Sequence, residues 1–255
     1  MVRATPETEN PPVGSSAEHR TSSRARSHRR LGLGAALVGA AVLVGGAAML
    51  LTGDARPLTR STVQARAVPP LLEGNFTTAA ANGPAVGQGD IRRYRVETEN
   101  GIGVDPQLAA AQIRNILADK RSWTADGKDG FQLVADGTYD FTVRIASPTT
   151  VDRICGAAGL KTGGEVNCDV DKQVMVNVKR WTTGSPQFTG TIDDYRALII
   201  NHEVGHRIGH GHEGCPGAGK LAPAMMQQIY GLNGCLPNAW PYTADGTYIS
   251  GPPAP

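Results

Sequence analysis

The sequence is poor in aromatic residues and close to electrical neutrality, and both features exclude classes of partner. Aromatic residues make up 5% of the 255 residues, and the formal net charge is +2. From residue 91 onward the chain carries sixteen basic and seventeen acidic residues. Nucleic-acid-binding domains show a basic surface and often aromatic side chains that stack on bases. We therefore expect no nucleic-acid partner.

Charge is completely absent from one long stretch. Residues 31–52 read LGLGAALVGAAVLVGGAAMLLT, and five arginines lie between residues 20 and 30. At about 1.5 Å per residue such a helix crosses roughly 30 Å of hydrocarbon. The positive-inside rule then places the N-terminus in the cytoplasm and the rest of the chain outside. The sequence predicts one retained transmembrane helix. Cleavage of a signal peptide near Ala48 or Ala55 is the alternative, and both readings export the following domain.

The regions that flank this stretch lack the periodicity of folded elements. Residues 1–30 are rich in Pro, Ser, Thr and Arg, which predicts a disordered basic cytoplasmic tail. Residues 53–90 are rich in Pro, Ala, Gly and Thr, and this composition predicts a flexible extracellular linker. The globular domain is expected over residues 91–255. Asn75-Phe76-Thr77 is a glycosylation sequon, although such a triplet also occurs by chance in a Thr-rich segment.

Hydrophobic patterning from residue 91 predicts an α+β domain. Asp105 precedes Pro106 as an N-cap precedes the first helical position, and Thr191 and Asp194 have the spacing of a capping box. Alternating or apolar segments predict strands, and i, i+3, i+4 spacing predicts helices. The expected strands cover residues 91–97, 131–134, 139–145, 151–154 and 174–178, the expected helices residues 105–120 and 191–209, and irregular chain follows.

The chain has only four cysteines, Cys155, Cys168, Cys215 and Cys235. An exported domain meets an oxidising environment, so two disulfides are expected. Four cysteines allow three pairings. We expect the sequential pairing, Cys155–Cys168 and Cys215–Cys235, because each bridge then closes a local loop. A structural zinc site of four cysteines would require C-x-x-C spacing, which is missing.

Histidine is concentrated in one segment, because four of the six histidines lie within residues 202–212. His202-Glu203-Val204-Gly205-His206 is an HExxH motif. On a helix, His202 and His206 are one turn apart and point to the same side, where they can share one metal ion. Glu203 is displaced by about 100° and can reach a water on that metal without being a ligand.

The motif extends to HExxHxxGxxH. Gly209 allows the positive φ that turns the chain out of the helix, so His212 can return as a third ligand. Three imidazoles leave one open position on tetrahedral Zn²⁺, which is the catalytic rather than the structural arrangement. His210 competes as third ligand, and its simpler interpretation is a residue beside the metal site or at the surface. The simpler interpretation of Arg207 is a solvated charge on the helix surface. The simpler interpretation of residues 202–212 as a whole is a histidine-rich helix end that binds no metal.

This extended motif resembles that of the metzincin clan of zinc metallopeptidases. The resemblance implies a zincin-like catalytic domain with a mixed sheet, an active-site helix and a methionine turn beneath the metal. Met225, in the run 223–227, is the favoured methionine, and Met226 is the alternative. More closely, the layout is similar to a family of membrane-anchored zincin-like proteins of high-GC Gram-positive bacteria, through the anchor, the HExxHxxGHxH core, Cys-Pro-Gly at 215–217 and the run 225–241.

The resemblance implies a membrane-anchored zinc metalloendopeptidase, with Glu203 as general base toward a zinc-bound water. We expect a protein or peptide substrate of the cell envelope, extended along an edge strand such as residues 151–154. Several metzincins carry a tyrosine two residues after the turn methionine. Here Gln227 or Gln228 stands there, so the oxyanion stabiliser is unassigned and Tyr230 is only a neighbour in sequence. A non-catalytic zincin-like domain that binds an envelope partner and an amidase acting on cell-wall peptides are the alternatives, and the oligomeric state stays open.

Overall fold

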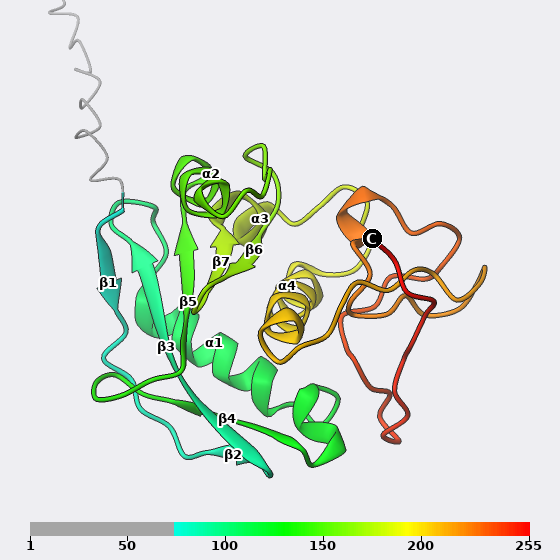
Figure 1. The fold of residues 1–255 in the computed structure, drawn as a ribbon, viewed down its shortest axis with the longest axis horizontal. Coiled ribbons are helices and arrows are strands. Elements are labelled where there is room, and N and C mark those ends of the chain that lie inside the picture. The colour runs from blue at the N-terminus through cyan, green and yellow to red at the C-terminus, as the bar shows by residue number, and fades with distance from the viewer. Residues whose placement is uncertain (1–73) are drawn as a thin grey trace, which may run out of the picture. The chain divides into compact units, whose positions relative to one another are not determined.

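The computed structural model describes residues 74–255, which form one mixed sheet with helices on both faces and a long irregular C-terminal part (Figure 1). Two 3₁₀ turns, Trp123–Asp126 and Gln228–Tyr230, lie outside the main elements. The strands and helices in chain order are β1 Phe76–Thr78, β2 Val86–Gly87, β3 Asp90–Glu99, α1 Pro106–Ala118, β4 Asp129–Leu133, β5 Phe141–Ala146, α2 Pro148–Ala157, β6 Cys168–Val170, β7 Gln173–Asn177, α3 Val178–Thr183 and α4 Ile192–Arg207.

The sheet has seven strands in the order β2-β4-β3-β5-β7-β6, and β1 also pairs with β3. The pairs β3–β4, β3–β5 and β5–β7 are parallel, whereas β1, β2 and β6 run antiparallel to their neighbours. Within the described residues β6 pairs only with β7, so β6 forms an edge of the sheet. The predicted α+β class with a mixed sheet is therefore confirmed.

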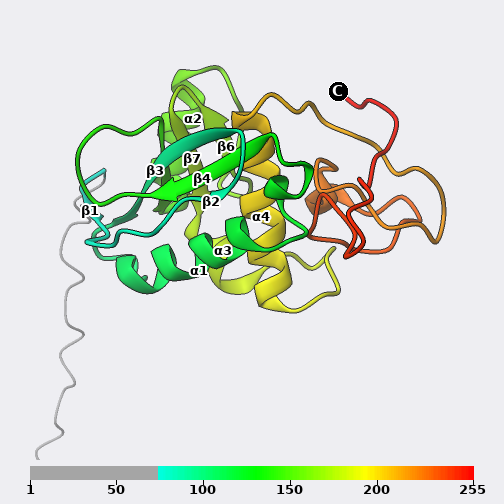
Figure 2. The same ribbon diagram turned by 90° about the horizontal axis from the view of Figure 1, so that it is seen from below.

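The two faces of the sheet carry separate hydrophobic cores. Val174 and Val176 of β7 belong to the larger core with α1, α3 and α4, while Met175 belongs to the smaller core with Cys155 of α2. Figure 2 shows α1 and α3 on the side of the sheet opposite α2. Side chains alternate along a strand. Because Asp169 of β6 pairs with Val174, its side chain lies on the α4 side of the sheet.

Both predicted helix starts are confirmed by their caps. The Asp105 side chain accepts hydrogen bonds from the first-turn N–H groups of α1, and Pro106 takes the first helical position. At α4, Thr191 and Asp194 each accept from the other's backbone N–H, which is a full capping box. These caps satisfy N–H groups that have no partner inside the helix. The two caps therefore set the residues at which α1 and α4 begin.

The predicted linker is wrong for residues 76–87. β1 pairs with residues 97–99 of β3 and β2 pairs with residues 130–131 of β4, so the folded domain begins well before residue 91. These strands have three and two residues, too few for a readable alternation. The tail over 1–30, the transmembrane helix over 31–52 and the linker up to residue 73 lie outside the described residues. Within residues 74–255, no helix combines the length and apolarity that a membrane crossing requires.

The predicted edge strand over residues 151–154 is also wrong, because these residues lie inside α2. Ser147 caps this helix by accepting from Thr150 N–H at 3.3 Å, and Pro148 occupies the first helical position. Val151 and Cys155 are four residues apart and bury the same face. The apolar residues here follow a helical spacing, which a four-residue window cannot distinguish from a strand.

Both disulfides have the predicted sequential pairing. Cys155–Cys168 joins α2 to β6, and Cys215–Cys235 closes a loop in the C-terminal part. The second bridge belongs to a small buried cluster with Ala222 and Met226. The C-terminal segment has little regular secondary structure, and this bridge contributes to its packing instead.

Candidate functional site

The last turns of α4 bring the first two predicted ligands together. His202 and His206 lie one turn apart with ring centroids at 4.8 Å. Gly209 has φ +101° and turns the chain back, which places the His212 ring 4.7 Å from that of His206. The ligand nitrogens of all three rings lie within 4.8 Å of one another, and His206 Nε2 and His212 Nε2 are 3.1 Å apart. The three histidines singled out in the sequence therefore converge.

Each ring is oriented through its other nitrogen by a main-chain oxygen. His202 Nδ1 lies 2.8 Å from Ala224 O, His206 Nδ1 lies 2.9 Å from His210 O, and His212 Nδ1 lies 2.9 Å from Pro255 O. A carbonyl oxygen only accepts hydrogen bonds, so each Nδ1 carries the proton and donates. In the neutral ring Nε2 then holds a lone pair, which is the state a metal ligand needs.

This arrangement fits a divalent cation. Two Nε2 atoms that both lack a proton repel each other at 3.1 Å unless a positive charge lies between them. Zinc binds imidazole nitrogen at about 2.0–2.1 Å with tetrahedral angles, which separates neighbouring nitrogens by about 3.3 Å. Three nitrogen donors with no cysteine match the zinc sites that keep a position open. His202, His206 and His212 are thus the residues that would hold the ion.

Burial favours the neutral form of these imidazoles. It lowers the pKa of His202 to about 3, and the neighbouring His206 acts in the same direction. The pKa of His206 is lowered as well, mainly by burial. Metal binding requires unprotonated imidazole. His202 and His206 therefore favour the unprotonated form that an ion needs.

Glu203 lies between the first two histidines and is 5% exposed. Burial, reinforced by the negative charge of Asp169, raises the pKa of Glu203 to about 8. A carboxyl group shifted into this range exchanges protons readily near neutral pH. The predicted general base therefore lines the same cleft as the three histidines, in a setting that suits proton transfer.

Asp169 is a residue of the site that the sequence analysis missed. Its carboxylate lies 3.3 Å from the Arg207 guanidinium, so Arg207 is paired rather than freely solvated as expected. Burial raises the pKa of Asp169 to about 6, and Arg207 partly opposes this rise. The contact ties the edge strand β6 to the end of α4. Nothing in the sequence motif signals it, because it depends on the pairing of β6 with β7.

A glycine in α4 allows two buried side chains to reach the helix. A Cβ on Gly205 would overlap Met225 Sδ and lie 2.8 Å from Trp123 Cζ2. Met225 is fully buried against Gly205, the residue before His206, whereas Met226 lines the cleft. Of the two candidate turn methionines, Met225 is therefore the one that packs beneath the ligand-bearing helix.

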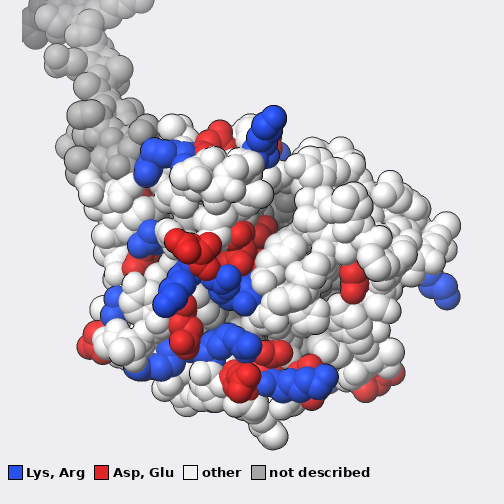
Figure 3. Space-filling model, in the orientation of Figure 1, with Lys and Arg blue, Asp and Glu red and all other residues white. Residues whose placement is uncertain are grey.

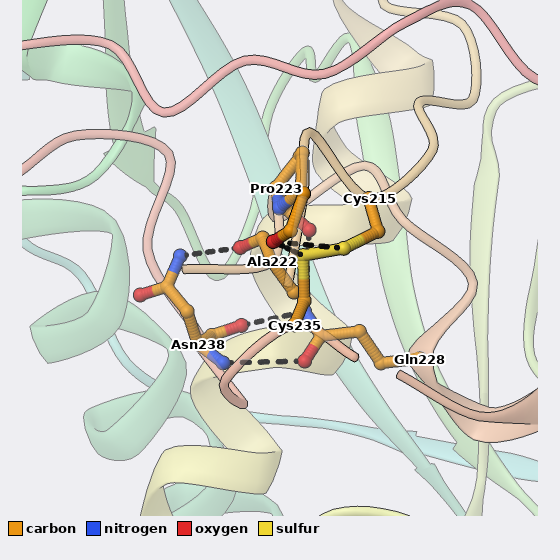
Figure 4. Close-up of a disulfide and its surroundings, with 7 residues drawn as sticks. Cys215, Ala222, Pro223, Gln228, Cys235 and Asn238 are labelled. Atoms are coloured by element: carbon orange, nitrogen blue, oxygen red, sulfur yellow. Dashed lines mark hydrogen bonds between the residues drawn. A yellow bond between two sulfur atoms is a disulfide. The ribbon is translucent and has the colours of Figure 1, made fainter. Parts of the chain in front are cut away.

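The turn that carries Ala224 O is held by side-chain amides. Gln228, almost fully buried, donates through Nε2 to Pro223 O at 3.2 Å and to Asn238 O at 2.6 Å. Asn238 Nδ2 donates to Ala222 O at 2.8 Å. Figure 4 shows the Cys215–Cys235 bridge beside this turn. The amides and the bridge together fix the carbonyl that orients His202.

His210 is not the third ligand in this arrangement. Its ring stacks on Trp123 with centroids 4.2 Å apart, and its carbonyl accepts from His206 Nδ1. Trp123 Nε1 in turn donates to Asn201 O at 2.8 Å. His210 therefore supports a ligand through its backbone, while its ring anchors the turn after α4 to the rest of the domain.

A cleft of about 430 Å³ opens over the three histidines. Tyr230 lines this cleft and is 68% exposed. On the face that Figure 3 draws, acidic and basic side chains are interspersed over the sheet, whereas the C-terminal part is mostly uncharged. The cleft is lined by residues 160–162 and 166–169, by α4 residues between 195 and 206, by His212, and by residues 226–230.

One protein family matches the chain, over residues 64–236, and its description is "Protein of unknown function (DUF3152)". The chain belongs to this family. The DUF3152 match spans both disulfides and all three histidines, and it ends before residues 237–255. No curated protein and no solved structure matches the chain.

Proposed function

We propose that this chain is a zinc metalloendopeptidase with a metzincin-type catalytic domain. His202, His206 and His212 hold the zinc ion. The observation that carries the proposal is the set of three Nδ1–H groups bonded to main-chain oxygens, which leaves the Nε2 lone pairs of three neighbouring rings free for a metal ion. Zinc at this position would lower the pKa of a water molecule toward neutrality and polarise the scissile carbonyl.

Glu203 moves the protons of the reaction. It takes a proton from the attacking water and delivers it to the nitrogen of the departing amine. Burial of Glu203 and the nearby Asp169 favour proton uptake by this carboxyl group, and the Asp169–Arg207 contact holds Asp169 in place. The same residue thus serves as base before the bond breaks and as acid afterwards.

The substrate is an extended peptide of the cell envelope that lies along β6. This strand replaces the segment 151–154 that the sequence suggested, because it is the sheet edge that adjoins the cleft. Unpaired backbone groups of an edge strand bind an extended peptide by strand addition. Cys168 and Asp169 of β6 line the cleft, so a peptide on this edge passes next to the histidines.

The domain acts outside the cell, held by one transmembrane helix over residues 31–52 with the N-terminus in the cytoplasm. Five arginines before the apolar stretch support this orientation. The two disulfides support an oxidising compartment, because the cytosol keeps thiols reduced.

The decisive experiment measures zinc content and cleavage of a peptide library by the purified full chain. We expect about one zinc per chain and cleavage that stops on chelation. Glu203→Gln should retain zinc and lose cleavage by a factor of at least ~100, since general acid–base catalysis contributes this much. Asp193→Asn is the matched control, because it removes a carboxylate on the same helix that is 73% exposed.

Two other outcomes would replace this proposal. Zinc binding without cleavage of any peptide or of purified cell wall would indicate a non-catalytic domain that holds an envelope partner. New free amines from purified cell wall, without cleavage of the peptide library, would indicate an amidase. Unchanged cleavage by Glu203→Gln would reject the assigned base.

A further inference from the structure

The end of the chain folds back on the segment that carries the third histidine. Gly214 N donates to Pro252 O at 2.7 Å, and Ala254 N donates to His212 O at 3.0 Å. Glu213 and Pro253 lie between these bonds as an antiparallel bridge. Residues 252–254 therefore pair with residues 212–214 like a short strand, although all of residues 237–255 lie beyond the family match.

This pairing ends at the ring of His212. Pro255 O accepts from His212 Nδ1 at 2.9 Å, and it is the only hydrogen-bond partner of that nitrogen among the described residues. His202 and His206 are held by α4 as well as by their carbonyls. His212 lies after the end of α4, in irregular chain, so no helix holds its ring in place. Residues 251–255, called the C-terminal tail below, provide this support instead.

Residues 251–255 are anchored by partly buried contacts in addition to this pairing. Glu213 accepts from Tyr248 Oη at 3.0 Å and from Gly251 N at 3.1 Å. A Cβ on Gly251 would overlap Gly214 O, so only glycine allows the two backbones to come this close. The contact is thus built from side chain, backbone and a required glycine, which indicates a specific arrangement.

We propose that residues 251–255 are a positioning element for metal binding, which fixes the His212 ring in the tautomer and orientation that a zinc ion needs. The inference rests on the proposed function, since it assumes that the three histidines bind zinc. Without Pro255 O the His212 ring can rotate and its proton can occupy either nitrogen. Groups that orient metal ligands in this way are worth about 10- to 100-fold in metal affinity.

The test compares zinc dissociation constants of full-length variants by competition with a chromogenic chelator. Deletion of residues 254–255 should raise the dissociation constant about 10- to 100-fold. Deletion of Pro255 alone removes the acceptor but keeps the pairing of residues 252–254, so it should raise the constant in a chain whose fold is undisturbed. Asp245→Ala is the control, because this exposed side chain bonds only within the turn 243–247 of the same C-terminal part.

A double-mutant cycle separates positioning of His212 from a general loosening. In the His212→Ala background, deletion of residues 254–255 should change zinc affinity less than twofold, because the ring that the tail orients is gone. The visible spectrum of the Co²⁺-substituted chain should also change on deletion, toward the weak absorption of higher coordination numbers. Metal-free chains should show the same thermal midpoint for wild type and the Pro255 deletion.

The outcomes distinguish this inference from the proposed function. If the wild-type chain binds no zinc, the metal site is wrong and the inference falls with it. If the wild-type chain binds zinc and both deletions bind it equally well, the tail has no positioning role while the metal site stands. An equal loss of affinity in the His212→Ala background would likewise overturn the assigned role.

Discussion

Replacing Gly205 by alanine tests whether the packing under α4 outweighs helix propensity. In an open helix position this change stabilises by about 1 kcal/mol, because alanine is the better helix former. Gly205 lies in the last turn of α4 and is buried, and a Cβ there overlaps Met225 Sδ and approaches Trp123 Cζ2 to 2.8 Å. Overpacking a well-filled core costs about 1–3 kcal/mol, and here both neighbours are fully buried.

Because both neighbours are fully buried, we take the upper part of the overpacking range, about 2–3 kcal/mol, and subtract about 1 kcal/mol for helix propensity. We therefore expect Gly205→Ala to lower the free energy of unfolding by about 1–2 kcal/mol net. For a domain of this size that is a fall of roughly 2–8 °C in thermal midpoint. Thermal unfolding followed by circular dichroism in the presence of chelator measures this value without a contribution from bound metal. Zinc affinity should fall as well, because Met225 lies next in the chain to Ala224, whose carbonyl orients His202.

Gly156→Ala is the matched control. Gly156 lies in α2, is exposed, and a Cβ there would meet no atom within 4 Å. This variant should gain about 0.5–1 kcal/mol. Combining Gly205→Ala with Met225→Ala should cost at least about 1 kcal/mol less than the sum of the two single changes, because the methionine makes the overlap. A Gly205→Ala variant as stable as wild type or more stable would refute the argument.

Three further predictions concern groups around the site. In chelated protein, Asp169→Asn should become more stable relative to wild type as the pH rises from 4 to 7. The folded pKa of Asp169 is about 6, above the unfolded value, so the native state binds the extra proton in this range and loses stability as that proton leaves; a pH-independent difference in thermal midpoint would contradict this. Replacing Cys215 and Cys235 by serine should cost about 3 kcal/mol in urea unfolding, because the bridge closes a segment of 20 residues; a loss below about 0.5 kcal/mol would show that the loop is already constrained. Gln228→Leu should cost about 1–3 kcal/mol by leaving Asn238 N–H without its partner, whereas Gln227→Leu at an exposed position should stay within about 0.5 kcal/mol; equal effects of the two would remove the structural role of Gln228.

Local signals in the sequence predicted the parts of the fold that depend on neighbouring residues. The Thr191–Asp194 capping box fixed the start of α4, and the four-residue spacing of His202 and His206 fixed their common face. Gly209 predicted the turn that returns His212. Each of these depends on a few consecutive positions, where propensity and side-chain geometry act directly.

The missed parts depend on pairings between distant segments. β1 and β2 are too short to show alternation, and they are strands only because β3 and β4 offer unpaired edges. A helix signal precedes residues 151–154, namely the Ser147 cap followed by Pro148. The strand prediction for these four residues rested on their apolar side chains and did not take this signal into account. The contact of Asp169 with Arg207 has no local signature at all, because it joins a sheet edge to a helix end.

The acceptors that orient the three imidazoles are all main-chain oxygens, from Ala224, His210 and Pro255. Every amino acid supplies a main-chain oxygen, so substitutions at these three positions leave an acceptor in place. A set of main-chain acceptors tolerates amino-acid substitutions better than a set of aspartate or glutamate side chains. It is vulnerable instead to insertions, deletions and backbone shifts in three separate segments, so natural variation around this centre should be rich in substitutions and poor in changes of loop length.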